Sequence, residues 1–195
     1  MCELFGVNSA RPVRTNDLLQ DFFTHCCDHP QGWGIALCDH GVSIEKEPKK
    51  ASTSAYLKER MNSSILARNL LAHIRLATIG NMEYDNTHPF VGYDISGRTW
   101  TQIHNGTLFE APDVDPYFYR ERGSTDSAWM LLYFLDRVEE ATLKAGHPLN
   151  ADERTTLVEK TLYARSRAII AVTDGWEEHF RSLGINPAKV TVVPN

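Results

Sequence analysis

The order of apolar and polar residues predicts a chain in which strands and helices alternate. Residues 2–9 alternate as a strand does, and residues 15–27 repeat apolar positions at helical spacing. Thr15 or Asn16 is the predicted N-cap of this helix, since short polar side chains accept from its first free amides. One buried face is predicted for it, made of Leu18, Leu19, Phe22 and Phe23.

The same periodicities and the turn residues between them predict the remaining elements. Residues 32–48 are expected to form a hairpin that turns at 39–41. A helix is predicted over 124–146, where Ser124 or Thr125 provides the cap and Asp126 lies in the first turn. The other predicted elements are helices over 54–65, 150–166 and 176–184, strands over 70–78, 100–109, 168–175 and 189–195, and a long loop over 81–98.

Composition restricts the class of protein without naming a function. The chain has 195 residues, 42% hydrophobic residues and a net charge of −5. This is enough for one domain with a sizeable core, and neither a basic nucleic-acid surface nor an apolar membrane span is apparent. Four cysteines without a paired pattern do not suggest a secreted disulfide framework, and no signal peptide is apparent, so a cytoplasmic location is expected.

A cysteine stands directly after the initiator methionine. Removal of Met1 would leave Cys2 with a free α-amine, whose pKa of about 7.7–8.0 suits it as a base for a thiol of pKa near 8.5. An N-terminal amine can activate a nucleophile in this way without a histidine. The alternative is that Cys2 simply packs in the first strand.

Three further stretches supply groups that such a nucleophile would need. Asn105-Gly106 could form an oxyanion hole, although Asn-Gly also marks ordinary hairpin turns. Arg75 interrupts an apolar strand, where a guanidinium could grip a substrate carboxylate or pair with a carboxylate of the core. Asp126, near a helix N-terminus, could hold a substrate ammonium or only stabilise that helix.

The stretches MCELFG, QGWGIAL, LLAHIRLATIG, NTHPF, IHNGTLF and STDSAWM together resemble the class II glutamine amidotransferase domain, and most closely its small stand-alone branch that begins Met-Cys-Glu. The resemblance covers residues 1 to about 135. It implies an α+β fold, the four-layer αββα sandwich of N-terminal nucleophile hydrolases, with no cofactor. It also implies site roles for a set of residues: Cys2 as nucleophile, Asn105 and Gly106 as oxyanion hole, Arg75 with Thr78 on the α-carboxylate, Asp126 on the α-amine, and His73, His88, Trp33 and Gly34 shaping the pocket.

This chain departs from the family pattern at two places. The family often has Arg-Gly or Lys-Asp before GWG, where this chain has HPQ at 29–31. Some members have a histidine after the strand threonine, where this chain has Ile79. These differences affect the expected support of the nucleophile and one expected substrate contact.

The end of the chain shows a second resemblance. Residues 167–195 resemble a strand–helix–strand fragment of a nucleotide-sugar glycosyltransferase, while residues 1–166 are predicted to form the amidotransferase domain. So short a fragment cannot enclose a nucleotide-sugar site, and the alternative is that it supplies the last elements of the sheet. Its apolar strands are expected to be buried.

One run of residues in the sequence could be taken for a metal site. The run HCCDH at 25–29 offers two histidines and two cysteines, but structural zinc sites favour spaced pairs of ligands. A helix end followed by a loop is therefore expected there, and no metal.

The expected activity is hydrolysis of the glutamine side-chain amide through a Cys2 thioester, giving glutamate and ammonia. Another γ-glutamyl amide is an alternative substrate, and a catalytically silent glutamine-sensing or partner domain is an alternative of another class. The expected partners are glutamine or a γ-glutamyl compound, with a possible ammonia-accepting synthase and a possible homodimer. Neither nucleic acid nor membrane is expected as a partner.

Overall fold

The structure is a computed structural model. It describes residues 2–108, 111–120, 123–163, 169–171, 175–186, 188 and 190–192. These residues fall into two compact units, Met1–Tyr133 and Phe134–Asn195. The described part contains antiparallel sheets and helices, which agrees with the predicted mixture, whereas the four-layer sandwich stays a prediction.

A four-stranded antiparallel sheet forms the centre of the first unit. Its strands are β1 (Glu3–Arg14), β2 (Trp33–Leu37), β3 (Ser43–Glu47) and β4 (Leu66–Ile74), in the order β1-β4-β2-β3. β2 and β3 form the predicted hairpin. β1 continues beyond its predicted end, with an irregularity in its pairing with β4 between Asn8 and Val13.

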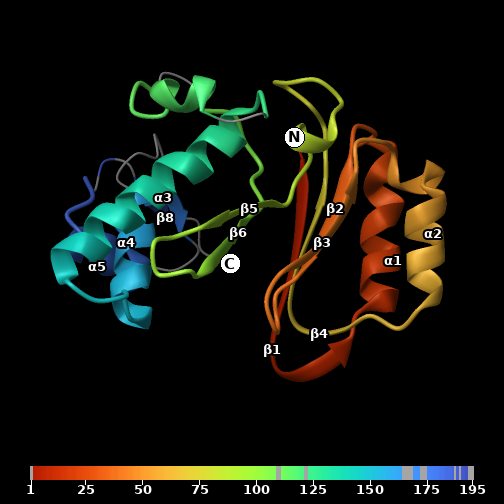
Figure 1. The fold of residues 1–195 in the computed structure, drawn as a ribbon, viewed down its shortest axis with the longest axis horizontal. Coiled ribbons are helices and arrows are strands. Elements are labelled where there is room, and N and C mark those ends of the chain that lie inside the picture. Colours follow the sequence, from red (N-terminus) through yellow and green to blue (C-terminus); the bar gives the residue numbers. More distant parts are fainter. Residues whose placement is uncertain are drawn as a thin grey trace. The chain divides into compact units, whose positions relative to one another are not determined.

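Two helices cover one face of this sheet, α1 (Asn16–Thr24) and α2 (Ala55–Asn62), as Figure 1 shows. They form a core with the inward residues of the strands, among them Leu19, Phe22, Phe23, Trp33, Ile35, Leu70, Ala72 and Ile74. Leu18 was wrongly predicted to belong to this face, since it is 54% exposed. It lies one position, about 100°, from Leu19 around the helix, which turns it away from the sheet.

The start of α1 also differs from the prediction. Thr15 precedes the helix, but its hydroxyl donates to the Ile65 carbonyl and caps nothing. Asn16 accepts from the Ile65 amide and donates to the Met61 and Ser63 carbonyls, at 2.8–3.0 Å. These two polar residues therefore tie α1 to the loop between α2 and β4.

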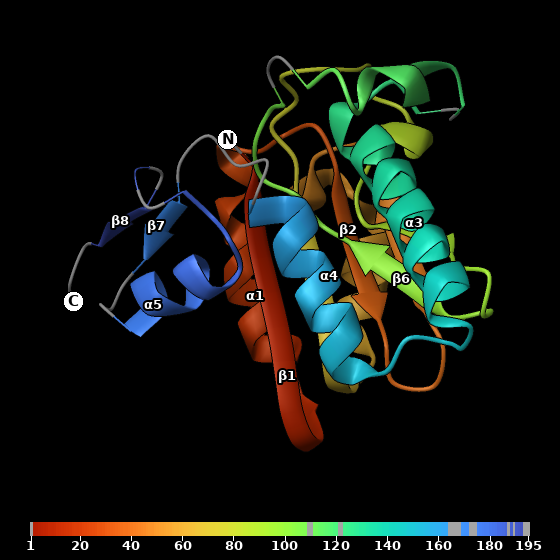
Figure 2. The same ribbon diagram turned by 90° about the vertical axis from the view of Figure 1, so that its left-hand side faces the viewer.

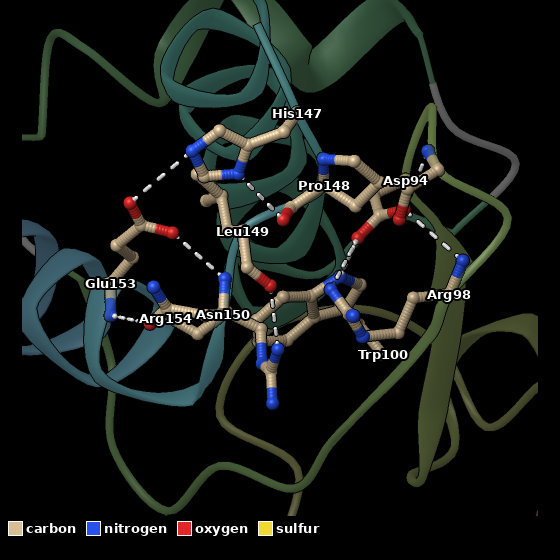
Figure 3. Close-up of polar contacts among 10 residues, drawn as sticks. Asp94, Arg98, Trp100, His147, Pro148, Leu149, Asn150, Glu153 and Arg154 are labelled. Carbon is tan, nitrogen blue, oxygen red and sulfur yellow. Dashed lines mark hydrogen bonds and ion pairs between the residues drawn. The ribbon is translucent and has the colours of Figure 1, made fainter. Parts of the chain in front are cut away.

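A second, smaller sheet lies over the opposite face of the large sheet (Figures 1 and 2). It is the hairpin of β5 (Phe90–Tyr93) and β6 (Thr99–Gln102). The predicted long loop over 81–98 is thus partly wrong, because it contains β5 and a short 3₁₀ helix at Tyr84–Asn86. The predicted strand over 100–109 ends at Gln102. Asp94 closes the hairpin: its carboxylate accepts from Ser96, Arg98 and Trp100 (Figure 3).

Helix α3 (Asp126–Ala145) begins in the first unit and continues into the second. Its predicted cap is confirmed, since the Thr125 hydroxyl accepts from the Ala128 amide at 3.3 Å. The side chain of Gln102, at the end of β6, donates to the Ser127 carbonyl at 3.1 Å. The first turn of α3 is therefore fixed to the small sheet.

The second unit contains the rest of α3 followed by α4 (Ala151–Tyr163), β7 (Ile169–Ala171), α5 (Gly175–Ser182) and β8 (Val190–Val192). α4 begins with a reciprocal capping box, in which Asn150 and Glu153 each accept from the other's amide at 2.8–3.0 Å (Figure 3). The strand–helix–strand prediction for the tail is confirmed, with β7 and β8 parallel. The predicted burial of these two strands concerns side chains that lie outside the described residues.

Candidate active site

Strand register decides which residues of the large sheet can meet in one site. Residues alternate between faces, and Leu4, His73 and Gly34 pair across β1, β4 and β2 on the face turned away from the helices. Cys2 and Arg75 follow the same alternation, one step beyond the paired Glu3 and Ile74. Two of the predicted site residues therefore come from strand ends that lie side by side.

Cys2 lies beside the end of β4. Its thiol donates to the Leu76 carbonyl at 3.5 Å. Burial raises the pKa of this thiol, an effect that the Arg75 guanidinium partly offsets and the Asp126 carboxylate reinforces. The thiol is thus predominantly protonated at neutral pH, and a base is needed before it can attack.

Arg75 is almost fully buried, with 3% of its surface exposed. Its guanidinium donates to the carbonyls of Asn81 at 2.9 Å, Ile79 at 2.8 Å and Gly80 at 3.3 Å. Burial lowers the pKa of Arg75, while Cys2 and Asp126 act in the opposite direction. Arg75 therefore shapes the loop after β4 while its charge influences the nucleophile.

Asp126 connects the first turn of α3 to the Asn-Gly segment. Its carboxylate accepts from the Leu108 amide at 2.6 Å and from the Ser127 amide at 2.8 Å. The negative charge of Asp126 also acts on both Cys2 and Arg75, where it favours the protonated form of each group.

The Asn105-Gly106 segment is exposed. The segment is held at its flanks, where the Thr107 and Thr78 hydroxyls bond at 3.0 Å and Leu108 is bound by Asp126. A Cβ on Gly106 would lie 2.9 Å from Nε2 of His104, so a larger residue would have to displace that ring. The predicted oxyanion donors thus stand on a short, anchored loop.

His73 and His88 are buried and stack with ring centroids 4.1 Å apart. His73 donates from Nε2 to the His104 carbonyl at 3.2 Å, whereas in the described part of the chain neither ring nitrogen of His88 has a hydrogen-bond partner. Burial lowers the pKa of His73 to about 3 and that of His88 still further. Both rings are therefore neutral at working pH.

The environment of this pair predicts a loss of stability in mild acid. The unfolded chain protonates both histidines below about pH 6.5, while the folded chain does not. The unfolded state therefore gains protons as the pH falls, and the free energy of unfolding should fall by roughly 1 kcal/mol per pH unit for each histidine. Urea titrations between pH 7 and pH 5 would measure this slope.

In the His88→Phe variant, one histidine fewer takes up a proton on unfolding, so the slope of the free energy of unfolding against pH should be smaller by roughly 1 kcal/mol per pH unit. Phenylalanine keeps a ring against Phe90, and the change removes no hydrogen bond among the described residues. His40 is exposed, so His40→Gln serves as the control and should keep the parent slope. An unchanged slope in His88→Phe would contradict the prediction.

Gly34 permits a close approach between the two sheets. A Cβ at this position would lie 2.1 Å from the His88 carbonyl oxygen and 2.7 Å from Pro89. Any side chain would therefore push His88, Pro89 and the small sheet that follows them away. Gly34 thus shapes this region by its lack of a side chain.

Trp33 does not lie where it was predicted. Its side chain is fully buried on the helix-covered face, beside Phe23 and Tyr56, and its indole donates to Glu47 at 3.2 Å. It lies next to Gly34 in sequence, and strand alternation sends the two to opposite faces. Trp33 therefore packs on the helix-covered face of the sheet, opposite to the face that Cys2 follows.

Comparisons of the sequence with known proteins identify its family. The sequence matches the family described as "Glutamine amidotransferases class-II" over residues 1–171. The chain belongs to the class II glutamine amidotransferases. It is 33% identical over 168 residues to a Haemophilus influenzae protein named "Putative glutamine amidotransferase", covering 83% of this chain and 56% of that protein.

Two further relatives show similar coverage. An uncharacterized protein of Methanocaldococcus jannaschii is 36% identical over 146 residues, which are 74% of this chain and 41% of that protein. "Putative glutamine amidotransferase YafJ" of Escherichia coli is 30% identical over 147 residues, or 72% and 56% of the two chains. This class II amidotransferase chain therefore spans about half the length of the curated relatives it matches.

The two departures from the usual amidotransferase pattern both touch the loop after β4. Gln31, in the unusual HPQ segment, accepts from the Ala77 amide through its side chain at 2.5 Å, and its own amide donates to the Arg75 carbonyl at 3.0 Å. Ile79 supplies one of the carbonyls that Arg75 binds. A glutamine thus supports the segment against which the Cys2 thiol rests.

Sequence reasoning did not single out two polar residues beside the candidate site. His104 bonds the Ser127 hydroxyl through Nδ1 at 2.9 Å, and burial lowers the pKa of its ring. Asn86 is fully buried between the loop after β4 and the segment that precedes α3. The position of His104 directly before Asn-Gly was the one signal available, while nothing local singled out Asn86.

The HCCDH run lies at the end of α1, as a helix end and loop. His25 and His29 both approach the carboxylate of Glu3, at 2.8 and 3.4 Å, while Cys26 is buried and Cys27 exposed. Within the described ranges, no group of three or more potential ligands could hold a metal ion. The helices in those ranges are also all too short or too polar to cross a membrane.

Proposed function

We propose that this protein hydrolyses the side-chain amide of glutamine, with Cys2 as an N-terminal nucleophile after removal of Met1. The observation that carries this proposal is that Cys2 and Arg75 stand at the adjacent ends of β1 and β4 and follow the same face of the sheet, where the Cys2 thiol donates to the Leu76 carbonyl. A thiol beside a cation, with the Asp126 carboxylate acting on both, suits a substrate that bears a carboxylate, an ammonium and an amide carbonyl.

The reaction begins with transfer of the thiol proton to the α-amine of Cys2. This base is needed because burial raises the pKa of the thiol, and because the buried histidines His73 and His88 are poor proton acceptors. The thiolate then attacks the side-chain carbonyl carbon and forms a tetrahedral oxyanion. The Asn105 amide and the Gly106 backbone N–H stabilise that oxyanion.

Collapse of the intermediate breaks the carbon–nitrogen bond. The leaving nitrogen takes the proton from the α-amine and departs as ammonia, which leaves a thioester on Cys2. Water then adds to the thioester carbonyl, the carbon–sulfur bond breaks, and glutamate leaves as the thiol regains a proton. Throughout, Arg75 with Thr78 binds the α-carboxylate and Asp126 binds the α-ammonium.

A diazo-ketone analogue of glutamine should label Cys2 and spare the other three cysteines. Cys26 is buried. Cys27 is exposed, but it follows α1 and is distant in the sequence from the residues predicted to bind the substrate. Burial raises the pKa of the Cys38 thiol, which disfavours its reactive form. Peptide mapping by mass spectrometry would locate the label.

Excess glutamine should protect Cys2 from this label, while an equal concentration of alanine should not. A label found mainly on Cys27, or a Cys2 label that glutamine leaves unaffected, would contradict the proposed site. Ammonia release from glutamine and from a panel of other γ-glutamyl amides, measured on the same sample, then separates the proposed glutaminase from a γ-glutamyl amidase and from a silent glutamine-binding domain.

A further inference from the structure

We propose that Asn86 is a positioning residue that fixes the separation between the two groups expected to bind the substrate's carboxylate and ammonium. This inference rests on the proposed function, because it concerns the same site. Asn86 ends the short helix at Tyr84–Asn86 and none of its surface is exposed. Its side chain bridges two loops that are distant in sequence.

One side of the bridge leads to Arg75. The Asn86 amide group donates to the Asn81 carbonyl at 3.1 Å. The guanidinium of Arg75 donates to the same carbonyl at 2.9 Å. The Asn81 carbonyl thus accepts from both side chains, and a displacement of Asn86 would remove one of the bonds that hold this carbonyl beside Arg75.

The other side of the bridge leads to Asp126. The Asn86 amide group also donates to the Ser124 hydroxyl at 3.1 Å, and its carbonyl oxygen accepts from the Ser124 amide at 2.7 Å. Ser124 lies two residues before Asp126, which begins α3. Asn86 therefore fixes the entry to this helix relative to the loop that Arg75 binds.

Glycines on both sides let the two loops come this close. Gly80 has a φ of +80°, and a Cβ on it would lie 2.9 Å from the Thr125 side chain and 3.1 Å from the Asn86 amide nitrogen. A Cβ on Gly123 would lie 2.7 Å from the Asp85 carbonyl oxygen. The junction is thus tightly packed, so its dimensions depend on the side chain that fills it.

Asparagine has the chemistry that this junction requires. The position needs two donated hydrogen bonds and one accepted hydrogen bond from a short side chain, and a primary amide supplies both kinds of group. Aspartate would lose both donors and bring a charge into a fully buried position.

The test compares two electrophiles on Cys2. A diazo-ketone analogue of glutamine needs both clamps to bind, whereas chloroacetamide carries neither an α-carboxylate nor an α-amine. In Asn86→Ala and Asn86→Asp, the ratio of the two labelling rate constants should fall about 10- to 100-fold, since a misplacement of about 1 Å can cost that much. KM for glutamine should rise in parallel, while the chloroacetamide rate stays near that of the parent.

Asn16→Ala is the matched control. Asn16 is likewise a buried asparagine whose side chain makes three hydrogen bonds, all of them to the backbone, but it lies on the helix-covered side of the sheet. Its loss should reduce thermal stability, as the loss of Asn86 does, without changing the labelling ratio. A labelling ratio that changes only in the Asn86 variants separates positioning from a general loss of stability.

Each outcome bears on one of the two proposals. If the parent protein shows no preference for the glutamine analogue, the proposed function fails, and the role of Asn86 fails with it. If the parent shows the preference and Asn86→Ala keeps it, only the role of Asn86 is overturned. Should the Asn86 variants not fold, Ser124→Ala removes one bond of the bridge; a ratio about 3- to 10-fold lower supports the proposal, and the parent ratio overturns it.

Discussion

A form of the protein that carries one extra residue ahead of Cys2 should bind glutamine and release almost no ammonia from it. The extra peptide bond converts the α-amine of Cys2 into an amide, which cannot accept a proton. General-base catalysis typically contributes about 100- to 10,000-fold in rate, so kcat should fall by at least about 100-fold. A coupled assay for ammonia would measure the loss, and intact-protein mass spectrometry would verify which residue comes first.

The matched control is the same extended protein after a protease has removed everything before Cys2. Activity should return with the new N-terminus, and thermal melting should show the same transition for both forms. If the extended form hydrolyses glutamine at the parent rate, the α-amine is not the base. The proton would then have to go to another group.

Replacement of Asn105 by alanine should lower kcat about 100- to 1000-fold and change KM little. The oxyanion that this amide is proposed to bind exists only along the reaction path, so its loss leaves substrate binding nearly intact. In the described part of the chain, the Asn105 side chain makes no hydrogen bond, and the variant should therefore fold as the parent does. Initial-rate kinetics with glutamine would give both constants.

Two other variants serve as comparisons for the kinetics of Asn105→Ala. Asn62 is exposed on α2, and Asn62→Ala should leave both constants unchanged. Asp126→Ala should raise KM, and it should also lower kcat, because the Asp126 carboxylate holds the Leu108 amide beside the Asn-Gly loop. A kcat for Asn105→Ala within about threefold of the parent would remove Asn105 from the proposed oxyanion hole.

Local sequence patterns were enough to predict the strands and helices that carry the site. Alternation in residues 2–9 and 70–78 follows from burial of one strand face, and the Thr125 cap follows from the need of a helix to satisfy its first amides. Arg75 stood out because a charged group in an apolar strand requires a partner or a role, and Asp126 because it lies near a predicted helix N-terminus. These signals lie within a few residues of the groups they identify.

The contacts that local patterns missed join segments distant in the sequence. Asn86 bonds Ser124 across 38 residues, and Gly34 lies against His88, just before β5. Trp33 was expected to help shape the pocket, but its side chain packs in the core on the helix-covered face of the sheet. The β5 strand was missed because it is short and lies between turn residues. Such features follow from tertiary packing, which a single sequence does not display.

The place of β4 in the sheet has a consequence for the site. β4 is flanked by β1 and β2, and its end carries both Arg75 and the Leu76 carbonyl on which the Cys2 thiol rests. The proposed nucleophile and the proposed carboxylate clamp are therefore both held at the end of one strand. A substitution that shifts β4 within the sheet should disturb the Cys2 thiol and the Arg75 guanidinium together.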